Sequence, residues 1–396
     1  MEDGSIFFND TSSTTTSDGS YPFDVPACPE EGVLYVFYHL PDLFIQQFLT
    51  TKIETTVITI VFPIIVVFGL LSNACFLFTI YRVREMRTIV NFYLANLAIS
   101  DMLLVTSTAI GYLYPYLSVS HAIRGGTPQT HIGCILFVIS TFITYFASIC
   151  LVTLVSFERF LAICYPLKHR AVNSKSRTVQ LTLCAWFVAA LLTAAVTPLG
   201  AKLNVTCVVW PPKYQRILPS VFAYCFPVSP VFLDIGTSFT LIPFVVALIL
   251  NTMFYIMIIR RLDDRKSISE ENPTTGQDHA TRQGVRMRNS VARMLVVNGL
   301  IFFVCLSVYQ FHSIDQYLYL KSRGEIDIIR PENEGMVQWI GNIMTVLNSA
   351  VNPVIYSATN SRYRKAFKIA VFGSVTNIQS ARNLSYVSSA RRVEDH

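Results

Sequence analysis

Five polar residues lie inside otherwise apolar stretches, where a charged or amide side chain is costly. They are Asp101 in NFYLANLAISDMLLV, Ser148 in ISTFITYFASICLVTL, and Asn348, Ser349 and Asn352 in VLNSAVNPVIY. Asn348 and Asn352 are four residues apart, so on a helix they share a face with Ser349 beside them. An ionised Asp101 needs a hydrogen-bonded, hydrated or cation-occupied pocket, which indicates a small water and sodium site. The same groups can instead join neighbouring helices by hydrogen bonds, and that alternative stays open.

A second pair of charges, Glu158 and Arg159, ends a long apolar run and is followed by YPLKHR. Pro166 closes the helix, and Lys168 and Arg170 follow it, so the pair is expected where hydrocarbon gives way to water. There Glu158 can neutralise Arg159 locally, and a helix movement can give Arg159 a new partner. The pair is therefore interpreted as a conformational switch, with a simple interfacial anchor as the alternative.

The segments that carry these residues are apolar enough to cross a membrane. The chain has 396 residues, 52% hydrophobic and 14% charged, whereas soluble domains carry about a quarter charged residues. A hydrocarbon core of about 30 Å requires roughly 20 helical residues. The last predicted span is the least apolar, because asparagines and Gln338 interrupt it. The seven predicted spans are 55–81, 89–117, 131–164, 178–199, 233–260, 290–318 and 336–357.

The segments between the spans differ in charge, and this difference predicts the orientation. Lys and Arg gather after the first, third and fifth spans and in the C-terminal tail, whereas the other segments, taken together, carry more Asp and Glu than Lys and Arg. Basic loops stay in the cytoplasm, so the N-terminus is expected outside the plasma membrane. Asn9 and Asn204, both on the predicted outer side, begin N-glycosylation patterns. The predicted domains are a glycosylated extracellular tail (1–54), a transmembrane bundle (55–360), an amphipathic helix (361–372) and a disordered cytoplasmic tail (373–396).

Four of the nine cysteines fall on the predicted outer side, where disulfides persist. Cys134, at the outer end of the third span, and Cys207, in the second outer loop, form the preferred pair. Such a bond would hold that loop across the mouth of the bundle. A bond between Cys28 and Cys225 stays open.

Over about residues 55–372 the chain resembles the rhodopsin-like (class A) G protein-coupled receptors. The resemblance rests on the order and spacing of its motifs. These are Asn73, LAISD ending in Asp101, Cys134 twenty-five residues before Arg159, FERF followed by Pro166, Trp186, Pro243, NPVIY (352–356) and NSRYRKAF (360–367). The resemblance implies an all-α membrane protein, with a seven-transmembrane helix bundle followed by a short amphipathic eighth helix.

The resemblance also implies roles for the matching residues. The activation switch for G-protein coupling would comprise Glu158, Arg159, Asn352, Pro353 and Tyr356. The allosteric sodium pocket would comprise Asp101, Ser148, Asn348, Ser349 and Asn352, and the family disulfide would be Cys134–Cys207. The implied partners are a heterotrimeric G protein, arrestin, receptor kinases and membrane lipids. No nucleic acid and no cofactor besides the sodium ion is expected.

The sixth span departs from the pattern of the family. It reads FFVCLSVYQFH, with Leu306 and Val308 where the family has Trp and Pro. Asn251 stands eight residues after Pro243, at a place where a Tyr commonly supports the active state. The usual ligand-sensing toggle and the usual kink are therefore not expected at these positions.

The ligand class is predicted by exclusion. Thr141 stands where amine receptors of this family have an Asp, and the seventh span has no lysine for a retinal Schiff base. The acidic outer surface would attract a cationic ligand, and nearby aromatic and amide groups suit an amidated peptide. The favoured ligand is therefore a neuropeptide. The predicted ligand pocket comprises Tyr112, Thr141, Asp234, Tyr309, Gln310, Ser313 and Asp315.

Two other functions stay open. One is a class A receptor for a lipid or another small molecule. The other is a membrane transporter, because intramembrane carboxylates and proline-broken helices also mark transport sites. Against a transporter, the sequence has no internal repeat, and Asp101 is the single deep acid. The membrane part carries no HExxH, phosphate-loop or nucleophile-elbow motif, so the chain is not expected to be an enzyme.

Overall fold

The apolar stretches form long helices, because backbone groups in hydrocarbon must be hydrogen-bonded within their own segment. The computed structural model describes residues 33–36, 45, 49–118, 130–229, 231–271, 279–322, 324–326, 328–329 and 331–373. These residues form two compact units. The first unit comprises the described residues up to Ile64, Thr106–Phe142 and Thr193–Ser238, and the second comprises Ile65–Val105, Ile143–Leu192 and those from Phe239 onward. Asn9, Cys28 and the tail after 373 lie outside the described residues.

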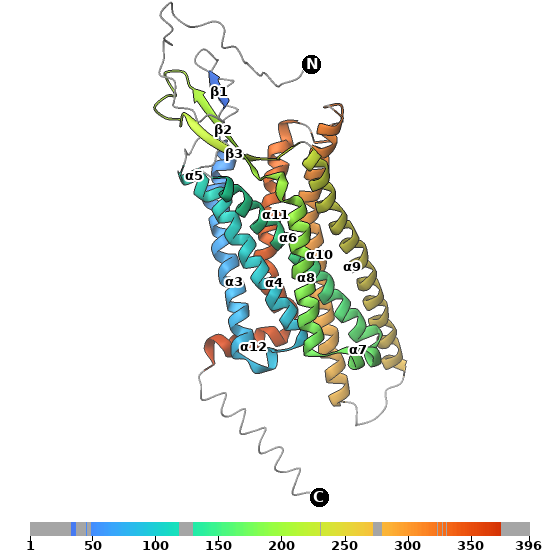
Figure 1. Cartoon of the computed structure of the whole chain (residues 1–396). Coiled ribbons are helices and arrows are strands. Elements are labelled where there is room, and N and C mark those ends of the chain that lie inside the picture. Colours follow the sequence, from blue (N-terminus) through green and yellow to red (C-terminus); the bar gives the residue numbers. More distant parts are fainter. Residues whose placement is uncertain are drawn as a thin grey trace, which may run out of the picture. The chain divides into compact units, whose positions relative to one another are not determined.

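Within the described ranges, seven helical segments correspond to the seven predicted spans (Figure 1). Six combine the length and low charge needed to cross a membrane, and the exception is α11, the span predicted to be the least apolar. The first segment comprises α2 (Lys52–Thr56), η1 (Val57–Val61) and α3 (Phe62–Arg82). The second comprises α4 (Ile89–Thr108), η3 (Ala109–Leu113) and α5 (Tyr114–Ser118). The others are α6 (His131–Cys164), α8 (Lys175–Val196) with η4 (Thr197–Leu199), α9 (Val231–Glu271), α10 (His279–Lys321) and α11 (Pro331–Thr359).

The described residues also include three short helices, namely η2 (Arg84–Met86), α7 (Pro166–Val172) and α12 (Ser361–Phe372). Helix α9 extends eleven residues beyond its predicted span, to Glu271. The added residues are mostly good helix formers, and the next proline, Pro273, cannot continue a helix. Helix α10 begins at His279 and is an unbroken α-helix through Leu306 and Val308.

A three-stranded sheet distinguishes the first unit (Figure 1). Strands β2 (Lys202–Val209) and β3 (Val221–Phe226) form an antiparallel hairpin, and β1 (Val33–Val36) pairs parallel to β2. Trp210 follows β2 and is almost fully buried, with its Nε1 donating to the carbonyl of Pro219 at 2.9 Å. It packs in an apolar cluster with Ile45, Val208, Leu218 and Phe222. This cluster gives the hairpin a core of its own.

The predicted disulfide between Cys134 and Cys207 is wrong. Cys134, in the first turn of α6, bonds Cys225 on β3, with their Cα atoms 5.6 Å apart. Cys225 stands opposite Leu203, four residues before Cys207 on β2, so the two candidates are about 13 Å apart along the hairpin. Only one of them can come within disulfide reach of Cys134. Cys207 is itself disulfide-bonded, and the proposed Cys28–Cys225 bond is excluded because Cys225 is taken.

In the second unit, α10 and α11 lie side by side (Figure 1). Helices α3 and α11 also approach closely, because Gly69 has no side chain to separate them. A Cβ at Gly69 would lie 3.1 Å from the Cβ of Ala350. Ser72 Oγ donates to the carbonyl of Ala350 at 2.8 Å, and Asn73 Nδ2 donates to the carbonyl of Ser349 at 2.9 Å. These contacts fix the part of α11 that carries the predicted cation site.

We expect Cys225→Ser to leave Cys134 as a free thiol, whereas Cys207→Ser should leave the Cys134–Cys225 bond intact. Because the bond joins residues 91 positions apart, its loss should destabilise the fold by roughly 2–4 kcal/mol. Mass spectrometry of a non-reducing digest measures the pairing directly. A linked Cys134–Cys207 peptide, or a free Cys134 in the Cys207→Ser protein, would contradict the structure.

Candidate functional site

Glu158, near the end of α6, is a buried carboxylate with 2% of its surface exposed. Its ion pair is with Arg177 at the start of α8, whose Nη2 lies 3.0 Å from Oε1. The Nε2 atom of His169, on α7, lies 3.3 Å from the Oε2 atom of Glu158, but the two atoms are not oriented for a hydrogen bond. Adjacent helical side chains point about 100° apart, so Glu158 and Arg159 face different neighbours. Glu158 therefore ties α6 to the segment that follows it.

Arg159 is partly buried, and its Nε is a buried donor without a hydrogen-bond partner among the described residues. Its positive charge acts on Tyr363 of α12. Tyr363 donates its hydroxyl proton to Oδ1 of Asn91. Burial raises the pKa of Tyr363 to about 12, although the nearby Arg159 opposes this shift. Tyr363 therefore stays a neutral donor at physiological pH.

An aromatic cluster joins α3, α11 and α12 beside Arg159. The Tyr356 ring lies 5.3 Å from that of Phe76 and 5.9 Å from that of Tyr363, between centroids. Phe76 and Tyr363 stack at 6.1 Å. Tyr356 has 1% of its surface exposed, and its buried hydroxyl has no hydrogen-bond partner in the described part of the chain. The predicted switch residues Arg159 and Tyr356 thus both keep a polar atom that can accept a new partner.

Tyr363 is a residue of this region that the sequence reasoning missed. Asn360 caps α12, with its Oδ1 accepting from the amide of Arg362 at 2.9 Å. The buried residues of α12 are Tyr363, Ala366 and Ala370, while Phe372 is 78% exposed. The spacing of three and then four residues between these positions is typical of one face of a helix, and it could have identified Tyr363 as buried.

Asp101 is a buried carboxylate on α4, with 1% of its surface exposed. Asn352 Nδ2 donates to its Oδ2 at 2.7 Å, and Ser349 also hydrogen-bonds it. Ser148 lies beside the residue that precedes Asp101, because its Oγ is 3.1 Å from that of Ser100. The structure therefore brings together residues from α4, α6 and α11 that are far apart in the sequence.

Three amide oxygens of this region are buried and have no hydrogen-bond partner among the described residues, those of Asn73, Asn348 and Asn352. Water or a bound cation satisfies such atoms in proteins. One carboxylate with hydroxyl and amide oxygens provides the oxygen donors that a hard, singly charged cation takes. No cluster of three His, Cys, Asp or Glu residues occurs in the part of the chain that the structure describes. The residues present fit a sodium ion better than a transition metal.

Gln310 and Asp315, both on α10, are the most buried of the predicted ligand residues. Gln310 Nε2 donates to the hydroxyl of Tyr145, which donates to the carbonyl of Thr240 at 3.3 Å. Its Oε1 is buried and lacks a hydrogen-bond partner among the described residues, and so does Nε2 of His312.

Asp315 has a contact that the sequence did not predict. Its Oδ1 accepts from the amides of Ile328 and Ile329, at 2.9 and 3.2 Å, so this carboxylate fixes the loop after α10. Ser313 donates to the carbonyl of Tyr309 at 3.1 Å, which is a contact within the helix.

The remaining predicted ligand residues belong to the first unit. The ring of Tyr112 lies 5.3 Å from that of Phe62. Thr141 lies on α6, and Asp234 is in the first turn of α9, where a negative charge complements the helix dipole. Asn204 lies on β2 opposite Tyr224 and is partly exposed.

The motifs and the helices agree with the comparison to known proteins. The family model for the 7 transmembrane receptor (rhodopsin family) matches residues 72–356. The chain belongs to the rhodopsin family of seven-transmembrane receptors. It is therefore a multi-pass membrane protein of the G protein-coupled receptor class, as the resemblance in its sequence predicts.

The similarity of this rhodopsin-family receptor to curated relatives extends over most of the chain. The thyrotropin-releasing hormone receptor of Homo sapiens is 25% identical over 346 residues, covering 82% of this chain and 80% of the relative. That of Ovis aries is 24% identical over 353 residues, with the same coverage. Neuromedin-U receptor 2 of Mus musculus is 25% identical over 333 residues, covering 79% of this chain and 75% of the relative.

In this rhodopsin-family receptor, a tyrosine one turn after Asn251 takes part in the hydrogen bonds between α6 and α9. The hydroxyl of Tyr255 donates to Oδ1 of Asn251 at 3.2 Å and accepts from Ser156 at 2.9 Å. Asn251 Nδ2 donates to Thr153 at 2.9 Å. A Cβ at Gly299 would lie 1.7 Å from this hydroxyl, so only glycine leaves room for it on α10. The sequence reasoning missed Tyr255, although its spacing of four from Asn251 placed it on the same face.

We expect Arg177→Ala to destabilise the receptor by about 3 kcal/mol, because it leaves the buried Glu158 carboxylate without its ion pair. Adding Glu158→Gln should recover part of this loss, since a buried amide costs less than an unpaired charge. Thermal unfolding of the purified receptor measures both effects. Arg170→Ala, an exposed arginine on α7, is the matched control. Equal stability of Arg177→Ala and the control would contradict the role of the pair.

Proposed function

We propose that this chain is a plasma-membrane receptor, with its N-terminus outside, that binds a neuropeptide and activates heterotrimeric G proteins. The excess of Lys and Arg in the segments after the first, third and fifth spans and in the C-terminal tail supports the orientation. The relatives named for thyrotropin-releasing hormone and neuromedin-U support a neuropeptide ligand. Glycosylation of Asn9 and Asn204 is part of the same proposal.

The observation that carries the ligand proposal is the buried Oε1 of Gln310, which has no hydrogen-bond partner among the described residues. A buried acceptor without a donor is unfavourable, and a peptide brings N–H donors at every residue. His312 Nε2, two residues further along α10, is a second such atom. A ligand with hydrogen-bond donors would satisfy the Gln310 acceptor, whereas His312, two residues further along, points to another face of α10. This requirement favours a peptide over a purely hydrophobic ligand.

G-protein coupling would act through Arg159. The adjacent residue, Glu158, forms its ion pair with Arg177. Arg159 can therefore exchange partners without leaving the buried Glu158 carboxylate unpaired. Tyr356 would join Arg159 when α11 moves, because its buried hydroxyl has no hydrogen-bond partner among the described residues. Pro353, in the same turn of α11 as Asn352, would give that movement a hinge. Arrestin and receptor kinases would act on the tail, which lies outside the described residues.

The Asp101 cluster would hold a sodium ion as an allosteric ligand, with Ser148, Asn348, Ser349 and Asn352 around it. We expect the purified receptor to melt at a higher temperature in sodium chloride than in potassium chloride of equal ionic strength, because a bound ion stabilises the folded state. Asp101→Asn should abolish the difference, since it removes the only charge of the cluster. Asp234→Asn, an acid of the first unit, should keep it. A difference that survives Asp101→Asn would refute the site.

Calcium and cyclic AMP responses in cells that express the receptor test the whole proposal against a panel of cationic and amidated neuropeptides. We expect a nanomolar response that Arg159→Ala abolishes while surface staining holds. A response to lipids or other small molecules alone would favour the alternative receptor class. Radiotracer uptake into vesicles would favour a transporter.

Gln310→Leu tests the ligand contact itself. It keeps the size of the side chain but removes the Oε1 acceptor, together with the Nε2 donor to Tyr145, so the potency of the active peptide should fall by about tenfold. Gln180→Leu makes the same change at an exposed position of α8 and should leave the potency unchanged. Equal potency of the two variants would show that Gln310 does not contact the peptide.

A further inference from the structure

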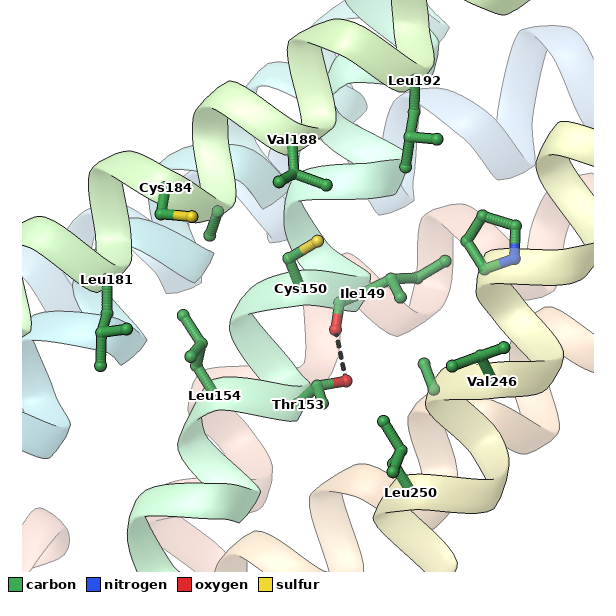
Figure 2. Close-up of a pocket in the computed structure, with 13 residues that line it drawn as sticks. Ile149, Cys150, Thr153, Leu154, Leu181, Cys184, Val188, Leu192, Val246 and Leu250 are labelled. Carbon is green, nitrogen blue, oxygen red and sulfur yellow. Dashed lines mark hydrogen bonds between the residues drawn. The ribbon is translucent and has the colours of Figure 1, made fainter.

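An apolar pocket of about 330 Å³ lies between α6, α8 and α9, within the second unit. Figure 2 shows Cys150 and Leu154 of α6 facing Cys184 and Val188 of α8, with Val246 of α9 on the third side. The volume lies within the range of about 300–1,000 Å³ that small-molecule sites occupy. None of the predicted ligand, sodium or switch residues lines it. The pocket is therefore a separate feature of the receptor.

The pocket is continuous with the surface that the spans present to hydrocarbon. Its rim residues Val188 and Val246 have 38% and 50% of their surfaces exposed. On the same helices, Leu183 and Ile249 are 63% and 55% exposed outside the pocket. Both helices belong to apolar spans, so the medium next to this rim is the bilayer interior. An occupant can enter from the membrane without crossing the aqueous side.

The lining also defines the chemistry of the occupant. Thr153 carries the only side-chain hydroxyl of the lining, which contains no aromatic or charged side chain. That hydroxyl donates to the carbonyl of Ile149 at 2.8 Å, a bond drawn in Figure 2, and accepts from Asn251 at 2.9 Å. With its proton used, Thr153 gives a polar headgroup little to bind. The part of the ligand inside the pocket is therefore plain hydrocarbon.

The pocket adjoins the hydrogen-bond chain that joins α6 to α9. Thr153 is one end of that chain, which continues through Asn251 and Tyr255 to Ser156, three residues before Arg159. Material that fills the space next to Thr153 would add van der Waals contacts to both helices at this level and so favour their present packing. The occupancy of the pocket is thereby connected to the region of the G-protein switch.

We propose that this pocket binds one acyl chain of a bilayer lipid, which stabilises the contacts between α6 and α9. The acyl chain matches an apolar lining that is open to the bilayer and offers a sterol hydroxyl only the weak thiol donors of Cys150 and Cys184. The site is distinct from the proposed peptide site and does not depend on the identity of that ligand.

The test uses the full receptor in lipid nanodiscs that contain phosphatidylcholine with a photoactivatable diazirine in its acyl chain. After irradiation, mass spectrometry locates the labelled residues. We expect the peptides that carry Cys150 and Val246 to be labelled at least fivefold more than the exposed apolar residues Ile64 and Leu71 of α3, which report general lipid contact. Labelling of the pocket at the level of α3 would refute the site.

Two tryptophan variants test whether the acyl chain lies in this pocket. Val188→Trp and Val246→Trp fill the rim, and each should lower labelling of the Cys150 peptide fivefold or more. Leu183→Trp and Ile249→Trp add the same side chain outside the pocket, and each should change labelling of the Cys150 peptide less than twofold. If a filling variant fails to fold, the labelling map of the unaltered receptor decides alone. A photoactivatable sterol that labels the Cys150 peptide in place of the acyl probe would overturn the assignment.

Discussion

The cost of polar groups in hydrocarbon is the constraint on which the structure depends. A buried carboxylate such as Asp101 is tolerated in an apolar helix only where other helices supply hydrogen bonds. Asn352 and Ser349 of α11 meet that requirement. Asn73 of α3 donates to the backbone of the same turn of α11. The polar residues thus determine which parts of α3, α4 and α11 must lie together, while the apolar residues alone would allow many packings.

The same constraint organises α6, which carries polar contacts at successive turns. Ser148 lies beside Ser100, Thr153 and Ser156 bond the network of α9, and Glu158 bonds Arg177. One rigid helix therefore adjoins the cation cluster, the α6–α9 contacts and the charged end of the bundle. A shift of this helix changes all of these contacts together, which is the property that a conformational relay needs.

Two tyrosines that the sequence reasoning missed make contacts between helices. Tyr255 lies one turn after Asn251 on α9, bonds it, and accepts a hydrogen bond from Ser156 of α6. The close packing at Gly299 leaves room for its hydroxyl. Tyr363 contributes in a similar way from α12, by packing against Tyr356 and bonding Asn91. The contacts of these two tyrosines hold α6, α9, α11 and α12 together near Arg159.

The sequence by itself determined the family, the helical spans and the depth of the polar residues, because these follow from hydropathy and from spacing along one helix. It also identified Asp101 and Asn352 as neighbours, since a deep carboxylate must find a donor. It did not determine which cysteine of the outer hairpin meets Cys134, or which base pairs with Glu158. Those choices depend on strand register and on the direction in which a side chain leaves its helix. Cys225, Arg177 and Tyr255 reach their partners through tertiary packing, and only the folded chain decides that packing.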